Sequence, residues 1–426
     1  MMKDSLNLLD ITAPIVSYYE DQNEPNESNY REETLPSKSD YRDIPSEFDP
    51  ETQNSIETGY FIFTQMPSLR CKLRCPHCYL SLEQRKSSPI MTVDQLEQAC
   101  LKVRAYYDGL PHIKNKVIMN YWYGGEPTQM GKEYMLDAFE RLDRVFPEKD
   151  GYHVRHEILT ALVGVDPSWY DIFRTWGRGH FQSSFDGLMR GKGYMKQWDK
   201  KARQAIAAGL TLSTISVVNN DLMRDGAKEV LDYLCDLGVQ EASFLPFMLN
   251  EQNKGDKYES FAPSMNGYSD FMIDLTEYWY EKRSKDEKVP QIGQMAFITS
   301  RHKMKNSSIG HNIAGQTLFL LPEGDFVLPD YRDGYLEYMN TFGNIFEQSF
   351  EEILTSKARR QYLRKQVTGN HNKDCFECAH KSHCIMEFWK PNREGDDCFG
   401  AKRYVDYLLK MEKEHGALSD MTAIMY

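Results

Sequence analysis

Cys71, Cys75 and Cys78 have the spacing C-x3-C-x2-C within the segment LRCKLRCPHCYLS. Three thiolates can hold three irons of a cubic 4Fe-4S cluster and leave the fourth iron open to a ligand that a fourth cysteine would exclude. The alternative is a zinc site in which His77 supplies a nitrogen ligand. That site would be strained, because the histidine lies between two closely spaced thiols. The spacing therefore favours an iron–sulfur cluster with an open iron.

A second group of cysteines lies near the C-terminus, where Cys375, Cys378, Cys384 and Cys398 have the spacing C-x2-C-x5-C-x13-C. Four thiols close a metal site, which suits a structural or electron-transfer centre better than an open catalytic iron. Zinc remains an alternative ion for this group.

The first group resembles the hallmark of the radical S-adenosylmethionine enzymes, in which an aromatic residue such as Tyr79 often follows the third cysteine. In that family the open iron chelates the amino and carboxylate groups of S-adenosylmethionine. The reduced cluster then donates an electron to the sulfonium, and a 5′-deoxyadenosyl radical results. The resemblance implies that a low-potential reductant, such as flavodoxin or ferredoxin, is a partner of this chain.

Two further segments support the resemblance at the ends of later strands. Gly124, Gly125 and Glu126 of YGGEPT end an apolar strand, where glycine allows the backbone to approach a ligand closely. In the family this motif contacts the amino group of the methionine moiety, although an ordinary turn would also use these residues. Ser184 of SSFDG matches a serine that commonly hydrogen-bonds the cofactor, and Arg190 is a candidate to pair with its carboxylate.

Lys192 is an alternative partner for that carboxylate, and a solvent-exposed charge is an equal alternative for either basic residue.

The C-terminal cysteines resemble the SPASM and twitch extensions of radical S-adenosylmethionine enzymes. There, C-x2-C-x5-C and a later cysteine bind an auxiliary 4Fe-4S cluster. Full SPASM domains carry further cysteines, but Pro329 stands where one of these belongs, so we expect one auxiliary cluster in addition to the cluster of the first group. Asp330 matches the catalytic base proposed for anaerobic sulfatase maturases, and a turn aspartate is the alternative reading.

This resemblance implies a peptide maturase that abstracts a hydrogen from a ribosomally made precursor peptide carrying a leader. The preferred outcome is a cross-link between an aromatic side chain and a β-carbon, a cyclophane, on the analogy of overall length and architecture. Thioether formation, epimerisation and sulfatase maturation are open alternatives. A non-catalytic iron–sulfur electron carrier and a zinc-stabilised binding protein are rivals from other classes.

The composition is that of an ordinary globular chain. The 426 residues are 41% hydrophobic and carry a net charge of −12 with no basic stripe, which argues against nucleic acid or an anionic membrane as partner. No membrane span or secretory signal is visible, so we expect a cytoplasmic protein. Cys100 and Cys235 lie in apolar helical patterns and are predicted to be core thiols.

Strands and helices must position these residues, and they alternate along most of the chain. Strands are predicted over 59–66, 116–125, 152–164, 180–187, 211–219 and 241–249, and helices over 91–110, 131–146, 195–209, 225–238, 268–283 and 401–416. The first helix should begin with a capping box formed by Thr92 and Gln95. A β-hairpin is predicted over 316–331, with its turn at Glu323 and Gly324.

These elements predict an α/β fold in three parts. An irregular acidic arm covers 1–55, and a partial (β/α)6 barrel of the TIM type covers 56–290. A smaller α+β domain, SPASM/twitch-like and cluster-binding, covers 291–426 and ends in a helix. The loops after the barrel strands should carry the site.

Overall fold

The structure, a computed structural model, describes residues 60–303, 317–332, 335–367, 373–380, 384 and 393–415. The arm predicted over 1–55 lies outside the described residues.

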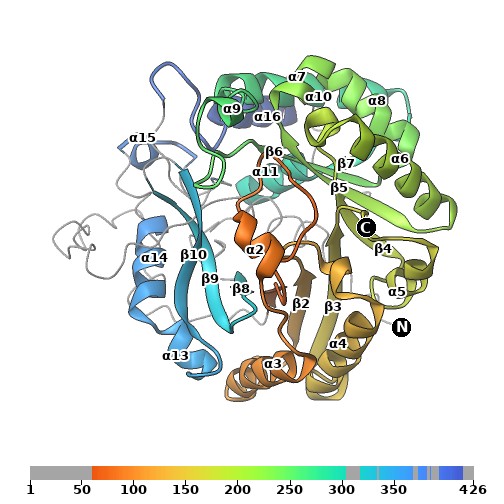
Figure 1. The fold of residues 1–426 in the computed structure, drawn as a ribbon. Helices are drawn as coiled ribbons and strands as arrows, with labels where there is room; N and C mark the ends of the chain where they lie inside the picture. The colour runs from red at the N-terminus through yellow and green to blue at the C-terminus, as the bar shows by residue number, and fades with distance from the viewer. Residues whose placement is uncertain are drawn as a thin grey trace.

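Six parallel strands form the centre of the fold, in chain order and each beside the next (Figure 1). They are β1 (Tyr60–Gln65), β2 (Lys116–Trp122), β3 (Tyr152–Thr160), β4 (His180–Ser184), β5 (Thr211–Val218) and β6 (Glu241–Pro246). Each falls within a predicted segment, and together they confirm the partial barrel. Because the strands are parallel, their carboxyl ends meet at one end of the barrel.

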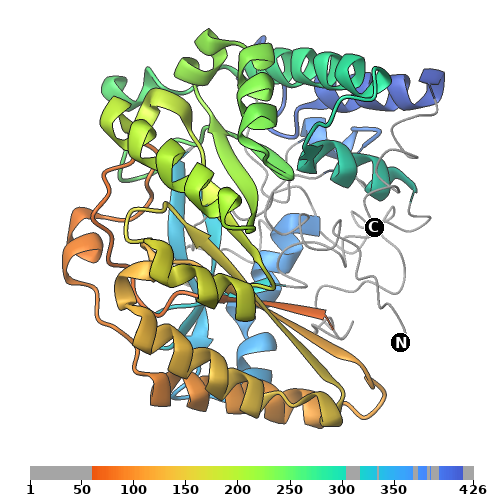
Figure 2. The same ribbon diagram turned by 90° about the vertical axis from the view of Figure 1, so that its right-hand side faces the viewer.

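Helices cover the outer face of this curved sheet (Figures 1 and 2). They are α3 (Val93–Asp108), α4 (Lys132–Val145), α5 (Tyr170–Thr175), α6 (Lys192–Ala207), α7 (Asn220–Asp225) and α8 (Ala227–Leu237). Helix α3 begins with the predicted capping box, in which the Thr92 side chain accepts from the Gln95 amide and the Gln95 side chain accepts from the Thr92 amide. Helices α5 and α7 were not predicted, because each has only six residues and shows no clear period.

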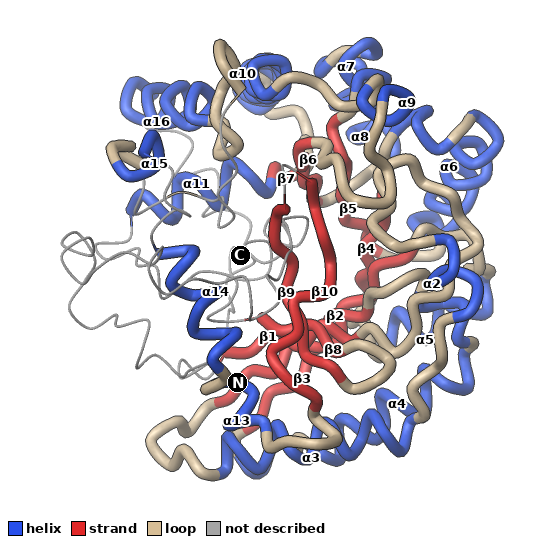
Figure 3. The backbone as a smooth tube through the Cα atoms, turned by 60° about the vertical axis from the view of Figure 1, so that its left-hand side comes forward, coloured by secondary structure: helices blue, strands red, loops and turns tan. Residues whose placement is uncertain are grey.

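The sheet continues beyond the six predicted strands at both edges. Strand β7 (Gln291–Ile292) pairs with β6, and β8 (Thr317–Leu320) pairs in parallel with β1. Strand β9 (Asp325–Arg332) returns antiparallel to β8 and is followed by β10 (Tyr335–Asn344), which gives a sheet of ten described strands (Figure 3). The hairpin predicted over 316–331 is therefore confirmed, and it extends the barrel sheet. The domain boundary at 290 stays a prediction.

Gly324 occupies the turn of this hairpin with a φ of 97°. A Cβ atom there would lie 2.4 Å from the Phe346 ring, so both the backbone conformation and the close approach require glycine.

The remaining helices pack around the last strands and the C-terminal segment. They are α2 (Leu82–Ser87), α9 (Asp256–Glu259), α10 (Met265–Ser284), α11 (Gly293–Lys303), α13 (Phe350–Leu354), α14 (Lys357–Val367), α15 (Lys373–Phe376) and α16 (Lys402–His415). Helices α10 and α16 match predicted helices and are joined by a hydrogen bond between the Thr276 and Tyr404 hydroxyls. Within the described ranges, no helix is long and apolar enough to cross a membrane.

Candidate active site

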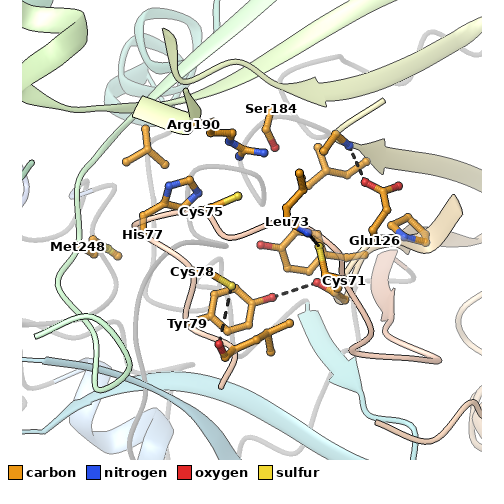
Figure 4. A pocket seen from close by; sticks show the side chains of 18 of the residues that line it. Cys71, Leu73, Cys75, His77, Cys78, Tyr79, Glu126, Ser184, Arg190 and Met248 are labelled. Carbon is orange, nitrogen blue, oxygen red and sulfur yellow. Dashed lines mark hydrogen bonds between the residues drawn. The ribbon is translucent and has the colours of Figure 1, made fainter. Parts of the chain in front are cut away.

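The nine residues predicted to hold the first cluster and the cofactor line one cavity at the carboxyl ends of the barrel strands (Figure 4). The cavity measures about 900 Å³, including its open mouth. The nine are Cys71, Cys75, Cys78, Tyr79, Gly124, Gly125, Glu126, Ser184 and Arg190. Segments that lie up to 119 positions apart in the sequence thus converge on one space.

The three thiols are free and partly buried in the loop after β1. Burial raises the pKa of Cys71 to about 11 and that of Cys75 to about 12, and Cys78 adds to both shifts by electrostatic repulsion. The positive charge of Arg190 opposes this rise at all three thiols. Thiolates are the ligands of iron, so binding a cluster here must displace protons, and Arg190 favours that step.

Backbone contacts with α2 hold the beginning of the cysteine loop. The Cys71 amide donates to the Arg85 carbonyl at 3.0 Å, and the Arg85 guanidinium donates to the Leu73 carbonyl at 2.8 Å. The short helix α2, which begins with a capping box at Ser81, therefore fixes the position of the first thiol.

Two buried asparagines hold the end of the same loop from the segment after β6. The Asn253 side chain donates to the Pro76 carbonyl at 2.5 Å, and the Asn250 side chain donates to the His77 carbonyl at 3.1 Å. The Asn250 backbone amide also donates to Asn253 Oδ1 at 2.7 Å, which fixes the Asn253 side chain against the Asn250 backbone. Sequence analysis did not identify this asparagine pair, because its partners lie more than 170 positions away.

Gly124 and Gly125 are required by a close approach of the chain to itself. A Cβ atom on Gly125 would lie 2.2 Å from the Arg70 carbonyl oxygen, and one on Gly124 would lie 2.6 Å from that of Ser68. The Gly125 amide donates to the Ser68 carbonyl at 3.2 Å. The glycines thus join the end of β2 to the cysteine loop, in addition to lining the cavity.

The carboxylate of Glu126 is buried and already engaged. One oxygen accepts from the hydroxyls of Thr128 at 2.6 Å and Thr160 at 2.8 Å, and the other accepts from the Ala161 amide at 2.8 Å. Its side chain therefore connects the ends of β2 and β3, and this segment offers the cavity mainly its backbone.

Ser184 and Arg190 reach the cavity from β4 and the turn that follows it. Adjacent Ser183 points the other way, where its hydroxyl donates to the Thr160 carbonyl at 2.6 Å. Arg190 is buried and pairs with Asp186 at 2.5 Å. Burial lowers the pKa of Arg190, but attraction to Asp186, together with smaller contributions from Cys75 and Tyr194, outweighs burial and holds the pKa above its usual value. The alternative residue Lys192 is exposed at the start of α6.

The cavity has further lining residues that the motifs did not indicate. His77, considered only as a zinc ligand, has its buried ring against Phe247 with centroids 6.3 Å apart. Leu159, Val217 and Met248 supply an apolar wall. These wall residues lie at or after the ends of β3, β5 and β6, where an apolar side chain gives no distinctive signal.

Tyr79 lies beside the glycine segment, since its hydroxyl donates to the Gly124 carbonyl at 3.5 Å. Its ring lies 6.3 Å from that of Tyr123, which also lines the cavity.

The second cysteine group is described at its four cysteines and in part between them. The Cys378 amide donates to the Cys375 carbonyl at 3.2 Å, so these two share a turn. Burial raises the pKa of Cys398 to about 11, and nearby Cys378 contributes by repulsion. The side chain of Cys384 packs against the main core. The side chain of Asp330 lies outside the described residues, although its backbone pairs with Glu337 in the hairpin of β9 and β10.

The thiols of the first group suit a group larger than a single ion. Zinc holds its thiolates at about 2.3 Å, which brings them close together. Among the described residues, no three His, Cys, Asp or Glu side chains are arranged to hold one metal ion. The thiols of the first group are nevertheless near enough to raise each other's pKa. Partly buried, mutually repelling thiols around an open cavity fit an iron–sulfur cluster.

Comparison with known proteins agrees with this geometry. Residues 312–379 match the SPASM family, described as an iron-sulfur cluster-binding domain, and this range includes Cys375 and Cys378. No curated protein has a matching sequence.

Solved structures with a similar fold include native anSMEcpe with bound AdoMet and Cp18Cys peptide. It is 18% identical, with a TM-score of 0.65, and the match covers 86% of this chain and 99% of that chain. Streptococcus suis SuiB bound to precursor peptide SuiA is 13% identical, with a TM-score of 0.52 and coverage of 76% of this chain and 71% of that chain. The chain therefore has the fold of radical S-adenosylmethionine enzymes, a partial barrel followed by a SPASM extension.

Proposed function

We propose that this protein is a radical S-adenosylmethionine enzyme that modifies a ribosomally made precursor peptide. The observation that supports this most is the convergence of three free thiols, a glycine strand end, Ser184 and Arg190 on one open cavity. The peptide part of the proposal is supported by the fold, which is shared with structures that hold a bound peptide.

In this proposal Cys71, Cys75 and Cys78 hold the 4Fe-4S cluster. Bound here and supplied with an electron by a low-potential reductant, the cluster and S-adenosylmethionine would provide the radical chemistry that removes a hydrogen atom from the substrate. Ser184 and the backbone of Gly124 bind the amino acid end of the cofactor by hydrogen bonds. The buried guanidinium of Arg190 attracts its carboxylate, and Asp186 holds that guanidinium in place.

The apolar wall of Leu159, Val217 and Met248 excludes water from the space beside the cofactor. The second group, Cys375, Cys378, Cys384 and Cys398, holds an auxiliary 4Fe-4S cluster. Asp330 remains our candidate for the base that takes a proton from the product.

The finer proposal is a cross-link between an aromatic side chain and a β-carbon of the peptide. Such a product has lost two hydrogen atoms, whereas epimerisation conserves the mass. Tandem mass spectrometry of a modified peptide distinguishes these outcomes and also separates a carbon link from a thioether.

The test is anaerobic reconstitution followed by reduction. We expect a brown protein with about eight irons per chain that converts S-adenosylmethionine into 5′-deoxyadenosine. Cys71→Ala should abolish this conversion, because it removes one of three ligands, while Cys235→Ala, on α8 away from both groups, should retain it. Brown protein without conversion would support an electron carrier, and colourless protein with zinc would support a binding protein.

A further inference from the structure

A cluster of polar residues lies inside the barrel, beneath the cavity. Side chains alternate along a strand, so residues two and four positions before a cavity-lining residue share its face. Leu159, Ser184 and Val217 line the cavity, which places Glu157, His180 and Ser213 on the inward face. One step of two residues is about 7 Å along the strand.

These inward side chains form a connected group. His180 Nδ1 lies 3.0 Å from Glu157 Oε2, and His180 Nε2 lies 2.8 Å from the Ser213 hydroxyl. Strand pairing adds Glu241 beside Ser213, and Gln291 beside Glu241. Residues paired on neighbouring strands point to the same face, so all five belong to the barrel interior.

The group holds two carboxylates and a buried amide that its neighbours do not satisfy. Among the described residues, neither Glu157 nor Glu241 forms an ion pair with lysine or arginine. Gln291 is 3% exposed, and neither its amide oxygen nor its amide nitrogen has a hydrogen-bond partner. A buried amide without a partner is costly, which indicates that a ligand completes this group.

A cation supplies what the group lacks. Burial raises the pKa of Glu241 to about 8, His180 lowers it, and Glu157 raises it further. A positive charge beside Glu241 would favour its ionised form, and an ammonium brings three donors and no acceptor. Glu157 and His180 retain 16% and 27% side-chain exposure, so the group is not sealed from solvent. Arg155, two residues before Glu157, is the basic residue on the same strand face.

We propose that Glu157 and Glu241 form a recognition site for a positively charged side chain, lysine or arginine, of the substrate peptide. This inference rests on the proposed function. Glu157 lies one step beneath Leu159 of the cavity wall, and a lysine stem spans about that distance. A peptide residue whose β-carbon is presented to the cofactor would therefore place its charge at the two carboxylates.

The experiment measures binding of two short peptides to the reconstituted full chain with S-adenosylmethionine. The probes are acetyl-Gly-Lys-Gly-amide and its norleucine counterpart, which lacks only the charged group, and the method is anaerobic calorimetry. We expect the lysine peptide to bind about 10-fold more tightly, as a buried charge-assisted contact allows. Glu157→Gln and Glu241→Gln should each remove most of this preference.

Glu133→Gln is the matched control, because it removes one negative charge from the exposed start of α4, outside the barrel. This variant should keep the preference for the lysine peptide. That result would distinguish a local binding site from general attraction of the peptide to an acidic protein. Equal binding of both peptides to the unmutated chain, or a preference that survives both interior substitutions, would overturn the inference. The proposed function is tested separately, by 5′-deoxyadenosine formation without peptide.

Discussion

Gly125 allows a sharp test at the scale of single residues. Alanine there would place its Cβ 2.2 Å from the Arg70 carbonyl oxygen, so the cysteine loop or the end of β2 must move. We expect Gly125→Ala to lower the free energy of unfolding by about 1–3 kcal/mol and to reduce the iron retained after gel filtration. Chemical denaturation and iron analysis measure the two effects.

Gly193→Ala is the matched control, because a Cβ atom at this position in α6 meets no atom within 4 Å. It should leave iron content unchanged and leave stability equal or higher by up to about 1 kcal/mol. If Gly125→Ala behaved like Gly193→Ala, the close packing of the two loops would be refuted.

Sequence motifs predicted which residues lie together at the cavity better than they predicted what each residue does there. The spacing of Cys71, Cys75 and Cys78 and the pair Gly124 and Gly125 were sufficient to find residues that share one cavity. The glycines were expected to make room for a ligand, yet their missing side chains first make room for the cysteine loop. The engagement of the Glu126 carboxylate depends on threonines of other segments, which no local pattern reveals.

At the scale of elements, the segment after β6 holds the cysteine loop in place through hydrogen bonds. Asn253→Ala would remove the donor to the Pro76 carbonyl and the acceptor of the Asn250 backbone amide, and Asn250 itself donates to the next carbonyl in the loop. Leaving the buried Asn250 N–H without its acceptor costs about 1–3 kcal/mol. We therefore expect faster loss of iron on dilution and a broadened electron paramagnetic resonance signal of the reduced cluster.

The neighbouring Gln252 is exposed and contributes only its backbone amide to this pair. Gln252→Ala should therefore match the unmutated chain in both measurements. Equal iron loss in the two variants would show that the loop is held by other contacts.

Long elements with a clear periodicity of apolar residues were the ones that the sequence predicted. Helices with a clear apolar face, such as α3 and α10, were predicted, and the hairpin of β8 and β9 followed from its glycine turn. The parallel pairing of β8 with β1 joins residues more than 250 positions apart, and it leaves no pattern in either strand. Because this pairing could not be predicted, the predicted boundary at 290 lies between strands that belong to one sheet.

On the scale of the whole molecule, the last cysteine is tied to the barrel through two aspartates. Asp397 accepts from the Cys398 amide at 2.8 Å and from the Ser269 hydroxyl of α10 at 2.7 Å. Asp396 accepts from the first two backbone amides of α10, those of Met265 and Asn266. The helix dipole also stabilises a negative charge at this N-terminus. Helix α10 follows the segment that carries the asparagine pair, so both cysteine groups are anchored near one stretch of the chain.

This connection gives a prediction for Cys398→Ala. The variant should keep about four of about eight irons, because it opens only the second group. Its remaining cluster should still change its electron paramagnetic resonance signal when S-adenosylmethionine is added, since Cys71, Cys75 and Cys78 are intact.

The thermal midpoint of the Cys398→Ala variant should fall, because a metal-linked turn that anchors α10 is released. Cys235→Ala, on α8, controls for loss of a thiol and should keep all the iron. Unchanged iron in Cys398→Ala would refute the second site, and loss of the cofactor response would show that the two sites do not assemble independently.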